Sequence, residues 1–313
     1  MLSSNITVCI FTWNEEHRIL NCIENFRNLF KIIVVDNYSN DNTVEVVKNA
    51  GVDVVSIKNP GFIETPEVMN RVLENCETNY VIIASVSEFL PFQLLKKYAE
   101  VANTESHDVV RVYRVSITAG KEIPISGPPT SKSPGEIRFF RKGAIDYQSN
   151  QVHSRGRPVC PENRILKLTQ DRSLYFFQFR DYDCSKTEIA MCRYDDLLAK
   201  QRYMSGSQFT WLDAFWKPIR CFAASYFWYG SYRYGMLGFI HSYYRWHMEF
   251  TILLRVWEWQ NSFTRDDVIE KNRKIRCQME SAFITEMSSS SDSTGSCPLT
   301  FPVESGERLN SAR

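Results

Sequence analysis

Two stretches decide the fold: ITVCIFTWNEE at residues 6–16 and KIIVVDNYSNDNT at residues 31–43. Each opens with a short apolar, β-branched run and ends in polar residues. Two further runs of strand character follow at Val52–Ile57 and Tyr80–Ala84. Segments with helical spacing lie between and after these runs, over Glu16–Leu29, Thr43–Ala50, Thr65–Cys76 and Pro91–Val101. Buried apolar strands that alternate with helices indicate βαβ units and a parallel sheet.

Polar side chains follow the first two predicted strands directly. Thr12, Asn14 and Glu15 follow the first strand, and Asp36 ends the second. Right-handed crossovers place these strand ends on one edge of the sheet, where open α/β sheets bind ligands. Either segment alone is also explained as a helix cap or a turn, but together they predict a ligand crevice. The absence of a glycine-rich loop after either strand excludes a dinucleotide fingerprint and a P-loop.

The pattern changes after Asp108. Strands are predicted at Val109–Thr118, Glu136–Arg141 and Arg164–Leu168, with a Pro/Gly/Ser-rich loop at Ile123–Gly135. We interpret these strands as an antiparallel extension of the parallel half. The predicted fold class is therefore α/β, with a mixed, mostly parallel sheet, flanking helices and a C-terminal helical region. The predicted domains are residues 1–180, an aromatic-rich helical extension at 181–285 and a disordered Ser-rich tail at 286–313.

Composition narrows the function classes. Lys+Arg 37 against Asp+Glu 36 argues against a nucleic-acid-binding protein. The nine Cys have no metal-ligand spacing, which favours buried thiols in a reducing compartment over a zinc site. No signal-peptide pattern and no apolar run of the ~18 residues that a membrane span needs are present. We expect a cytoplasmic protein, either free or peripheral on the cytoplasmic face of a membrane.

The segment Phe209–Trp259 is crowded with aromatic residues and interrupted by Lys and Arg. One interpretation is a helical core that packs on the preceding domain. The other is an interfacial segment, in which apolar wedges and cations contact anionic lipid. The sequence favours peripheral membrane association.

Several motifs, taken in order, resemble one enzyme family. The runs VCIFTWNEE, KIIVVDNYSNDNT and NRVLENCETNYVIIASVSEFLP, then RFFRKG and Val152-His153, are similar to the nucleotide-sugar half of family 2 glycosyltransferases. The nearest resemblance is to the inverting branch that adds hexoses to lipopolysaccharide core or related surface glycans. The resemblance implies the type-A glycosyltransferase fold, with residues 1–180 as the catalytic domain.

The resemblance also implies a set of site residues. Donor-binding candidates from the resemblance are Thr12, Asn14, Glu15, Asp36, Asn70, Ser85 and Ser87. Guanidinium chemistry adds Arg138 and Arg141, which could bind the diphosphate. Catalytic candidates are Glu88, as a general base, and His153. Helix-dipole stabilisation is the alternative explanation for Glu88, and a solvated basic strand is the alternative for the arginines.

Two positions depart from the family pattern. Ser85-Val86-Ser87 stands where the family has D-x-D, and Ser154 stands where an acidic residue usually follows the V-H pair. Hydroxyls are poor ligands for Mg²⁺ or Mn²⁺, so no metal residues are assigned and a divalent cation is disfavoured. Arginine forks could supply the missing charge.

Two functions follow. The first is an inverting glycosyltransferase that moves a hexose from a nucleotide sugar, with UDP as the expected nucleotide, to a glycan or lipid-linked acceptor. The second is a non-catalytic homologue that binds a nucleotide sugar or a glycan-assembly partner. A hydrolase has little support, because neither a nucleophile elbow nor paired carboxylates occur.

Overall fold

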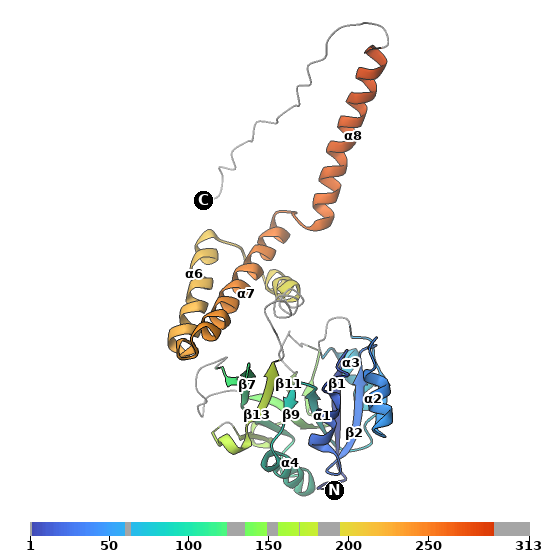
Figure 1. Cartoon of the computed structure of the whole chain (residues 1–313), viewed down its shortest axis with the longest axis vertical. Helices are drawn as coiled ribbons and strands as arrows, with labels where there is room; N and C mark the ends of the chain where they lie inside the picture. The colour runs from blue at the N-terminus through green and yellow to red at the C-terminus, as the bar shows by residue number, and fades with distance from the viewer. Residues whose placement is uncertain are drawn as a thin grey trace. The chain divides into compact units, whose positions relative to one another are not determined.

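A computed structural model describes residues 2–59, 64–123, 135–148, 156–168, 170–180 and 195–290 (Figure 1). The chain divides into one unit at residues 1–257 and a second unit that begins at Glu258. The two units are described separately below. The predicted domain boundaries at 181 and 286 remain predictions.

The centre of the first unit is a seven-stranded sheet in the order β12-β6-β9-β4-β1-β2-β3. Its strands are β1 Ile6–Thr12, β2 Lys31–Asp36, β3 Asp53–Ser56, β4 Tyr80–Ser85, β6 Val109–Val112, β9 Glu136–Arg141 and β12 Ile165–Leu168. Strand β1 pairs in parallel with β2 and β4, whereas β9 runs antiparallel to β4 and β6. Since β12 pairs in parallel with β6, the prediction of an antiparallel extension was wrong for β6 and β12, which run in the direction of β4. The predicted α/β class with a mixed, mostly parallel sheet is thus confirmed.

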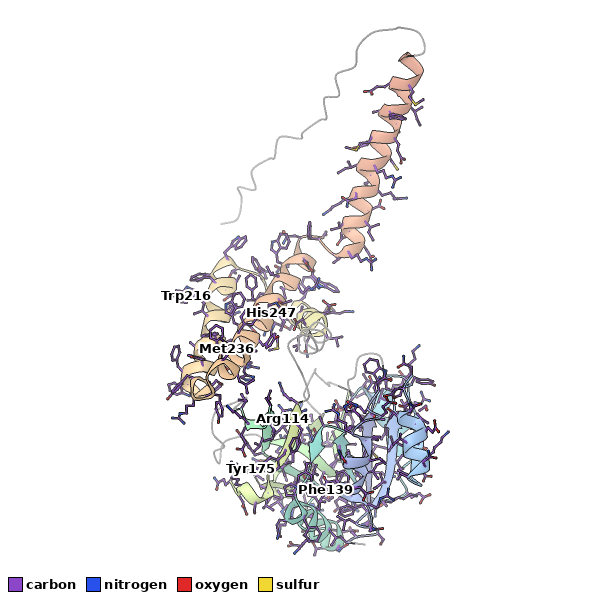
Figure 2. All side chains as sticks on the ribbon, in the orientation of Figure 1. Arg114, Phe139, Tyr175, Trp216, Met236 and His247 are labelled. Atoms are coloured by element: carbon purple, nitrogen blue, oxygen red, sulfur yellow. The ribbon has the colours of Figure 1, made fainter. Side chains whose placement is uncertain are left out.

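Helices cover this sheet because the strand side chains alternate between two apolar cores. Helices α1 Ile19–Phe26, α2 Thr43–Asn49 and α4 Phe92–Thr104 contribute to one core, and α3 Pro66–Glu74 contributes to the other. Val8 and Ile10 belong to the first core and Cys9 to the second, as the two-residue period of a strand requires. Phe139, labelled in Figure 2, stacks with Tyr80 and Tyr98 at 5.2 and 4.6 Å between ring centroids.

Two predicted boundaries in this part differ from the structure. The helix predicted from Glu16 begins only at Ile19, because the backbone N–H groups of Arg18 and Ile19 bond to Glu15 O in a turn. The strand predicted at Val109–Thr118 is two strands, β6 and β7 Arg114–Thr118, separated at Tyr113.

Strand β7 belongs to a second sheet, which has the strand order β5-β13-β7-β8. Its other members are β5 Glu88–Phe89, β8 Lys121–Glu122 and β13 Phe176–Arg180. This sheet was not predicted, because Val109–Thr118 was interpreted as a single strand. Strands β10 Ile145–Asp146 and β11 Arg157–Pro158 form a separate antiparallel pair.

Helices follow from residue 195 onward, as predicted. They are a segment at 195–204, α6 Trp211–Ala223, a π-helical turn at Ala224–Trp228, a 3-10 turn at Ser231–Tyr234 and α7 Met236–Gln260. Arg202 donates to both carboxylate oxygens of Glu249 at 2.7 Å, which ties the 195–204 segment to α7.

The start of α7 approaches the preceding turn closely. A Cβ atom on Gly238 would lie 1.7 Å from Ser231 O, so this approach requires glycine. Among the helices of the described residues, none is both long and apolar enough to cross a bilayer.

The second unit is represented by α8, Arg265–Ser290, which continues past the predicted start of the tail at 286. Residues 291–313, the rest of the predicted tail, and most of the loop predicted at Ile123–Gly135 lie outside the described ranges.

Candidate functional site

Thr12 and Asp36 lie side by side at the carboxyl ends of β1 and β2. They are register partners, and the backbone N–H of Asn37 donates to Thr12 O at 3.0 Å. Both residues are buried, with 6% and 2% of their surface exposed. The neighbouring ends of β1 and β4 mark the point where the strand order reverses, which is where open α/β sheets hold ligands.

The hydrogen-bonding capacity of this pair is incompletely used. The carboxylate of Asp36 accepts from the Ser39 backbone N–H at 3.1 Å and from Ser39 Oγ at 2.5 Å. No cation among the described residues pairs with it, and Thr12 Oγ1 is buried without a partner there. A buried carboxylate without a counter-charge and a buried unpartnered hydroxyl are costly. A ligand that donates to Asp36 and bonds Thr12 would offset that cost.

Asn14 connects the two loops that follow β1 and β2, where the sequence predicts the ligand crevice. Its backbone N–H donates to Ser39 Oγ, and its Oδ1 accepts from the Asn40 backbone N–H, both at 2.9 Å. Its φ of 54° is in the left-handed region that Asn tolerates. The Glu15 backbone N–H donates to Thr43 Oγ1 at 2.7 Å and adds a third bond between the loops. The predicted residues Thr12, Asn14 and Asp36 are therefore brought together.

The carboxylate of Glu15 points to a different partner. Arg18 holds it in a bidentate pair, with Nη2 to Oε1 at 2.6 Å. The structure thus places Glu15 in the crevice loop but uses its charge to hold Arg18. Asp41, in the facing loop, accepts from Thr43 and from the Glu16 backbone N–H. Burial raises the pKa of Asp41, but these hydrogen bonds outweigh burial and leave that pKa below its ordinary value.

The segment that replaces the family's D-x-D follows β4. Ser85 is the register partner of Phe11, which places it next to Thr12. Its backbone N–H donates to Glu88 Oε2 at 3.1 Å. Ser87 is half-buried, and its backbone oxygen accepts from the Phe179 N–H at 2.7 Å.

Glu88 and Arg138 form a fully buried ion pair. Arg138 Nη2 lies 2.6 Å from Glu88 Oε1, Nε lies 3.1 Å from Oε2, and both side chains are 0% exposed. Arg138 also contacts Glu136 at 2.9 Å and stacks over the Phe176 ring at 4.6 Å. Because both carboxylate oxygens are engaged and buried, Glu88 does not present a free base to an acceptor in this structure.

The two predicted arginines of β9, Arg138 and Arg141, lie beside different ends of β4. Phe139 pairs with Ile82, so Arg138 is beside the carboxyl half of β4. Arg141 pairs with Tyr80 at the start of β4, at the opposite edge of the sheet from the crevice. There its guanidinium lies 3.4 Å from Glu105 and 3.8 Å from Asp108. The structure therefore does not bring Arg141 to the donor crevice.

Among the described residues, no hydrogen bond or ion pair joins Asn70 to the loops that follow β1 and β2. Helix α3 begins at Pro66, capped by Thr65, so Asn70 lies within the helix and is exposed. His153 lies outside the described residues. Ser39 and Thr43, which hold the two loops, were not predicted, although the D-x-x-S-x-D-x-T pattern contains both.

A divalent cation does not fit the described residues around Ser85-Val86-Ser87. Hydroxyls replace the two carboxylates, and the neighbouring Glu88 is committed to Arg138. Among the described residues, no three His, Cys, Asp or Glu side chains come together as a metal site.

Comparisons with known proteins match the motif-bearing half of the chain. The family model described as Glycosyl transferase family 2 matches residues 7–152, a little under half of the chain. The curated "Uncharacterized glycosyltransferase RP128" of Rickettsia prowazekii (strain Madrid E) is 23% identical over 246 residues, covering 76% of this chain and 81% of the relative.

Solved structures of glycosyltransferases align at low similarity. S. aureus TarS is 15% identical with a TM-score of 0.43, and the match covers 78% of this chain but only 55% of that one. The mannosyltransferase PcManGT from Pyrobaculum calidifontis, solved with GDP-Man and Mn²⁺, is 12% identical with a TM-score of 0.44, covering 84% and 88%. At these TM-scores the fold assignment rests on the strand order and register described above.

Proposed function

We propose that this protein is an inverting glycosyltransferase that takes a hexose from a UDP-linked donor. The observation that carries the proposal lies at the strand-order reversal, where, within the described part of the chain, no cation pairs with the buried Asp36 and Thr12 Oγ1 has no partner. The family 2 match over residues 7–152 spans this crevice and supports the same activity.

Asp36 binds the donor in this proposal. Its carboxylate accepts a hydrogen bond from the N–H of the base or from a ribose hydroxyl, and Thr12 Oγ1 bonds the same nucleoside. Asn14 and Ser39 keep the two loops at a fixed separation, so the crevice is formed before the donor arrives. Asn70, Ser85 and Ser87 remain donor-side candidates from the family resemblance alone.

The reaction is a single displacement at the anomeric carbon. The acceptor hydroxyl oxygen forms a bond to that carbon while the bond to the diphosphate oxygen breaks, and the bonding electron pair leaves with the diphosphate. The hydroxyl proton passes to a base, for which His153 is the remaining candidate. Glu88 is assigned a positioning role, because its carboxylate holds both the Ser85 N–H and Arg138.

The acceptor in this proposal is a glycan or a lipid-linked saccharide, as in the lipopolysaccharide-core branch that the motifs resemble. A cytoplasmic location with peripheral contact to a membrane belongs to the same proposal. The cysteine usage supports the location, and the aromatic segment after residue 209 supports the membrane contact.

A non-catalytic nucleotide-sugar-binding protein is the second candidate. The observation that favours it is the loss of both D-x-D carboxylates together with the locked Glu88–Arg138 pair. Such a protein would bind UDP-sugars through Asp36 but would not turn them over.

Turnover of nucleotide sugars separates the two candidates. Release of UDP from UDP-hexoses is measured for the full chain, with and without EDTA and with a panel of glycan acceptors. The enzyme proposal predicts turnover that chelation leaves largely intact. Tight UDP binding without turnover of any donor would favour the binding protein, and the absence of both would contradict both candidates.

A further inference from the structure

The outward face of α6 is apolar, which reverses the usual pattern of a surface helix. Trp211, Leu212, Phe215 and Trp216 are 80%, 68%, 61% and 57% exposed. Positions 211, 212, 215 and 216 share one side of a helix, because they recur at spacings of three and four. The inward residues of α6 are the small Ala214 and Pro218, which are buried. We call these four exposed residues the α6 face.

Large exposed apolar residues continue beyond α6. Phe227 and Trp228, in the π-helical turn, are 66% and 83% exposed, and Met236 at the start of α7 is 72% exposed. Trp216 and Met236 are labelled in Figure 2 on α6 and α7. Ring contacts between Phe222 and Phe239, at 5.7 Å, connect α6 with α7. Exposed apolar area of this kind marks an interaction surface rather than an ordinary solvated one.

The charges of this segment are almost all positive. Residues 205–248 contain Lys217, Arg220, Arg233 and Arg245 and a single carboxylate, Asp213. Lys217 lies 3.2 Å from Asp213, and the Arg233 guanidinium lies over the Tyr232 ring at 5.6 Å. Two copies meeting through this segment would oppose cations with cations. An anionic lipid surface complements this segment, because its headgroups carry negative charge and its acyl chains are apolar.

We propose that the α6 face, with Phe227 and Trp228, inserts into the boundary between headgroups and acyl chains of an anionic bilayer. Trp prefers this boundary, and Arg220 and Arg233 would contact lipid phosphates. No described helix can span a bilayer, so the contact is that of a helix lying in the interface. This inference deepens the membrane contact within the proposed function by naming the surface and the lipid charge that it selects.

The test is binding of the full chain to vesicles, measured without nucleotide sugar. Co-sedimentation compares phosphatidylcholine vesicles with vesicles that also contain phosphatidylglycerol. The wild type is expected to bind the anionic vesicles selectively at low salt. Lipids brominated in the acyl chain should quench its Trp fluorescence, which requires Trp side chains at the boundary.

Matched variants localise the contact. Trp211→Ser with Trp216→Ser should reduce the partition coefficient at least about tenfold, because the apolar wedge is lost. Arg220→Glu with Arg233→Glu should reduce it about tenfold at low salt and less at high salt, because ions screen the attraction. Phe92→Ser is the control, since Phe92 is an exposed aromatic residue beside Lys96 on α4 and should leave binding unchanged.

Three outcomes would overturn the inference. The first is wild-type protein that ignores anionic vesicles at low salt. The second is equal loss of binding in the Phe92→Ser control. The third is a concentration-dependent dimer, seen by sedimentation and abolished by the Trp211/Trp216 changes, which would make a second copy the occupant. UDP binding by the Trp211/Trp216 variant, measured in parallel, shows that the variant is folded. It also separates failure of this inference from failure of the proposed donor site.

Discussion

Arg138 holds both carboxylate oxygens of Glu88 in a pair that is closed to solvent, at 2.6 and 3.1 Å. Glu88 in turn accepts from the backbone N–H of Ser85, at the end of β4. The antiparallel strand β9 is thereby connected to the loop where the family resemblance expects metal-binding carboxylates. The pair fixes the conformation of this loop through side chains of the protein itself.

Removing one partner of this pair should destabilise the fold strongly. Arg138→Met leaves Glu88 buried without a counter-charge and should lower the free energy of unfolding by about 3–5 kcal/mol. Adding Glu88→Gln to Arg138→Met should recover part of that loss, since the uncompensated charge is gone. Urea unfolding measures both values. Arg141→Met is the control, because its partly exposed contacts at 3.4 and 3.8 Å are worth less than about 1 kcal/mol. Equal losses at Arg138 and Arg141 would contradict the structure.

Removing the Ser39 hydroxyl should weaken the binding of UDP. Ser39 Oγ donates to Asp36 and accepts from the Asn14 backbone N–H. Ser39→Ala should weaken UDP binding by about 0.5–1.5 kcal/mol, because both loops lose their shared hydrogen bond. Calorimetry measures the affinity. Thr104→Ala, which removes an exposed hydroxyl bonded to Glu100 O in α4, should leave it unchanged. A Ser39→Ala variant with wild-type affinity would show that the loop network does not shape the donor site.

The wild-type protein should not depend on a divalent cation, and two substitutions should introduce a binding site for one. Ser85 and Ser87 offer hydroxyls where the family pattern has carboxylates, so the protein without nucleotide should show no saturable Mn²⁺ binding in calorimetry. Ser85→Asp combined with Ser87→Asp should create such binding. Saturable Mn²⁺ binding by the wild type, together with complete loss of turnover on chelation, would contradict this prediction.

Asp195 should make stability fall as the pH rises. Burial, with a smaller contribution from the neighbouring Asp196, raises the pKa of Asp195 to about 6, and neither carboxylate oxygen has a hydrogen-bond partner among the described residues. Because the folded pKa lies above the unfolded one, ionisation favours unfolding. Stability is therefore lost between about pH 4 and pH 6 and remains lower above that window.

Thermal unfolding of Asp195→Asn checks this sign. The variant removes the titration, so its stability relative to wild type should increase from pH 4 to pH 6 and then stay constant. A difference that is independent of pH would show that Asp195 does not titrate in this range.

The strand and helix pattern of the first hundred residues could be predicted because each element carries its own period. Glu136–Arg141 was also predicted with its observed boundaries. The switch between sheets at Tyr113 was not predicted, although the apolar alternation changes phase there, from Val110 and Val112 to Val115 and Ile117.

The position of the crevice was predicted, but not the contacts of every residue in it. Thr12 and Asp36 follow from the rule that parallel strands end on one edge. Long-range partners do not follow from local sequence, so the commitment of Glu15 to Arg18 and of Glu88 to Arg138 required the structure. The position of Arg141 depends on the direction of β9, which a run of six residues does not encode.

The most direct test of the account is the affinity of UDP for Asp36→Ala, measured by titration calorimetry beside wild type and Asp53→Ala. Asp53 is an exposed carboxylate at the start of β3, at the other edge of the sheet, and serves as the matched control. Asp36→Ala should lose a charge-assisted hydrogen bond worth about 1.5–3 kcal/mol, and thus at least about tenfold in affinity, while Asp53→Ala should bind UDP like wild type. A folded Asp36→Ala protein that binds UDP as tightly as wild type would contradict the placement of the donor site at the ends of β1 and β2.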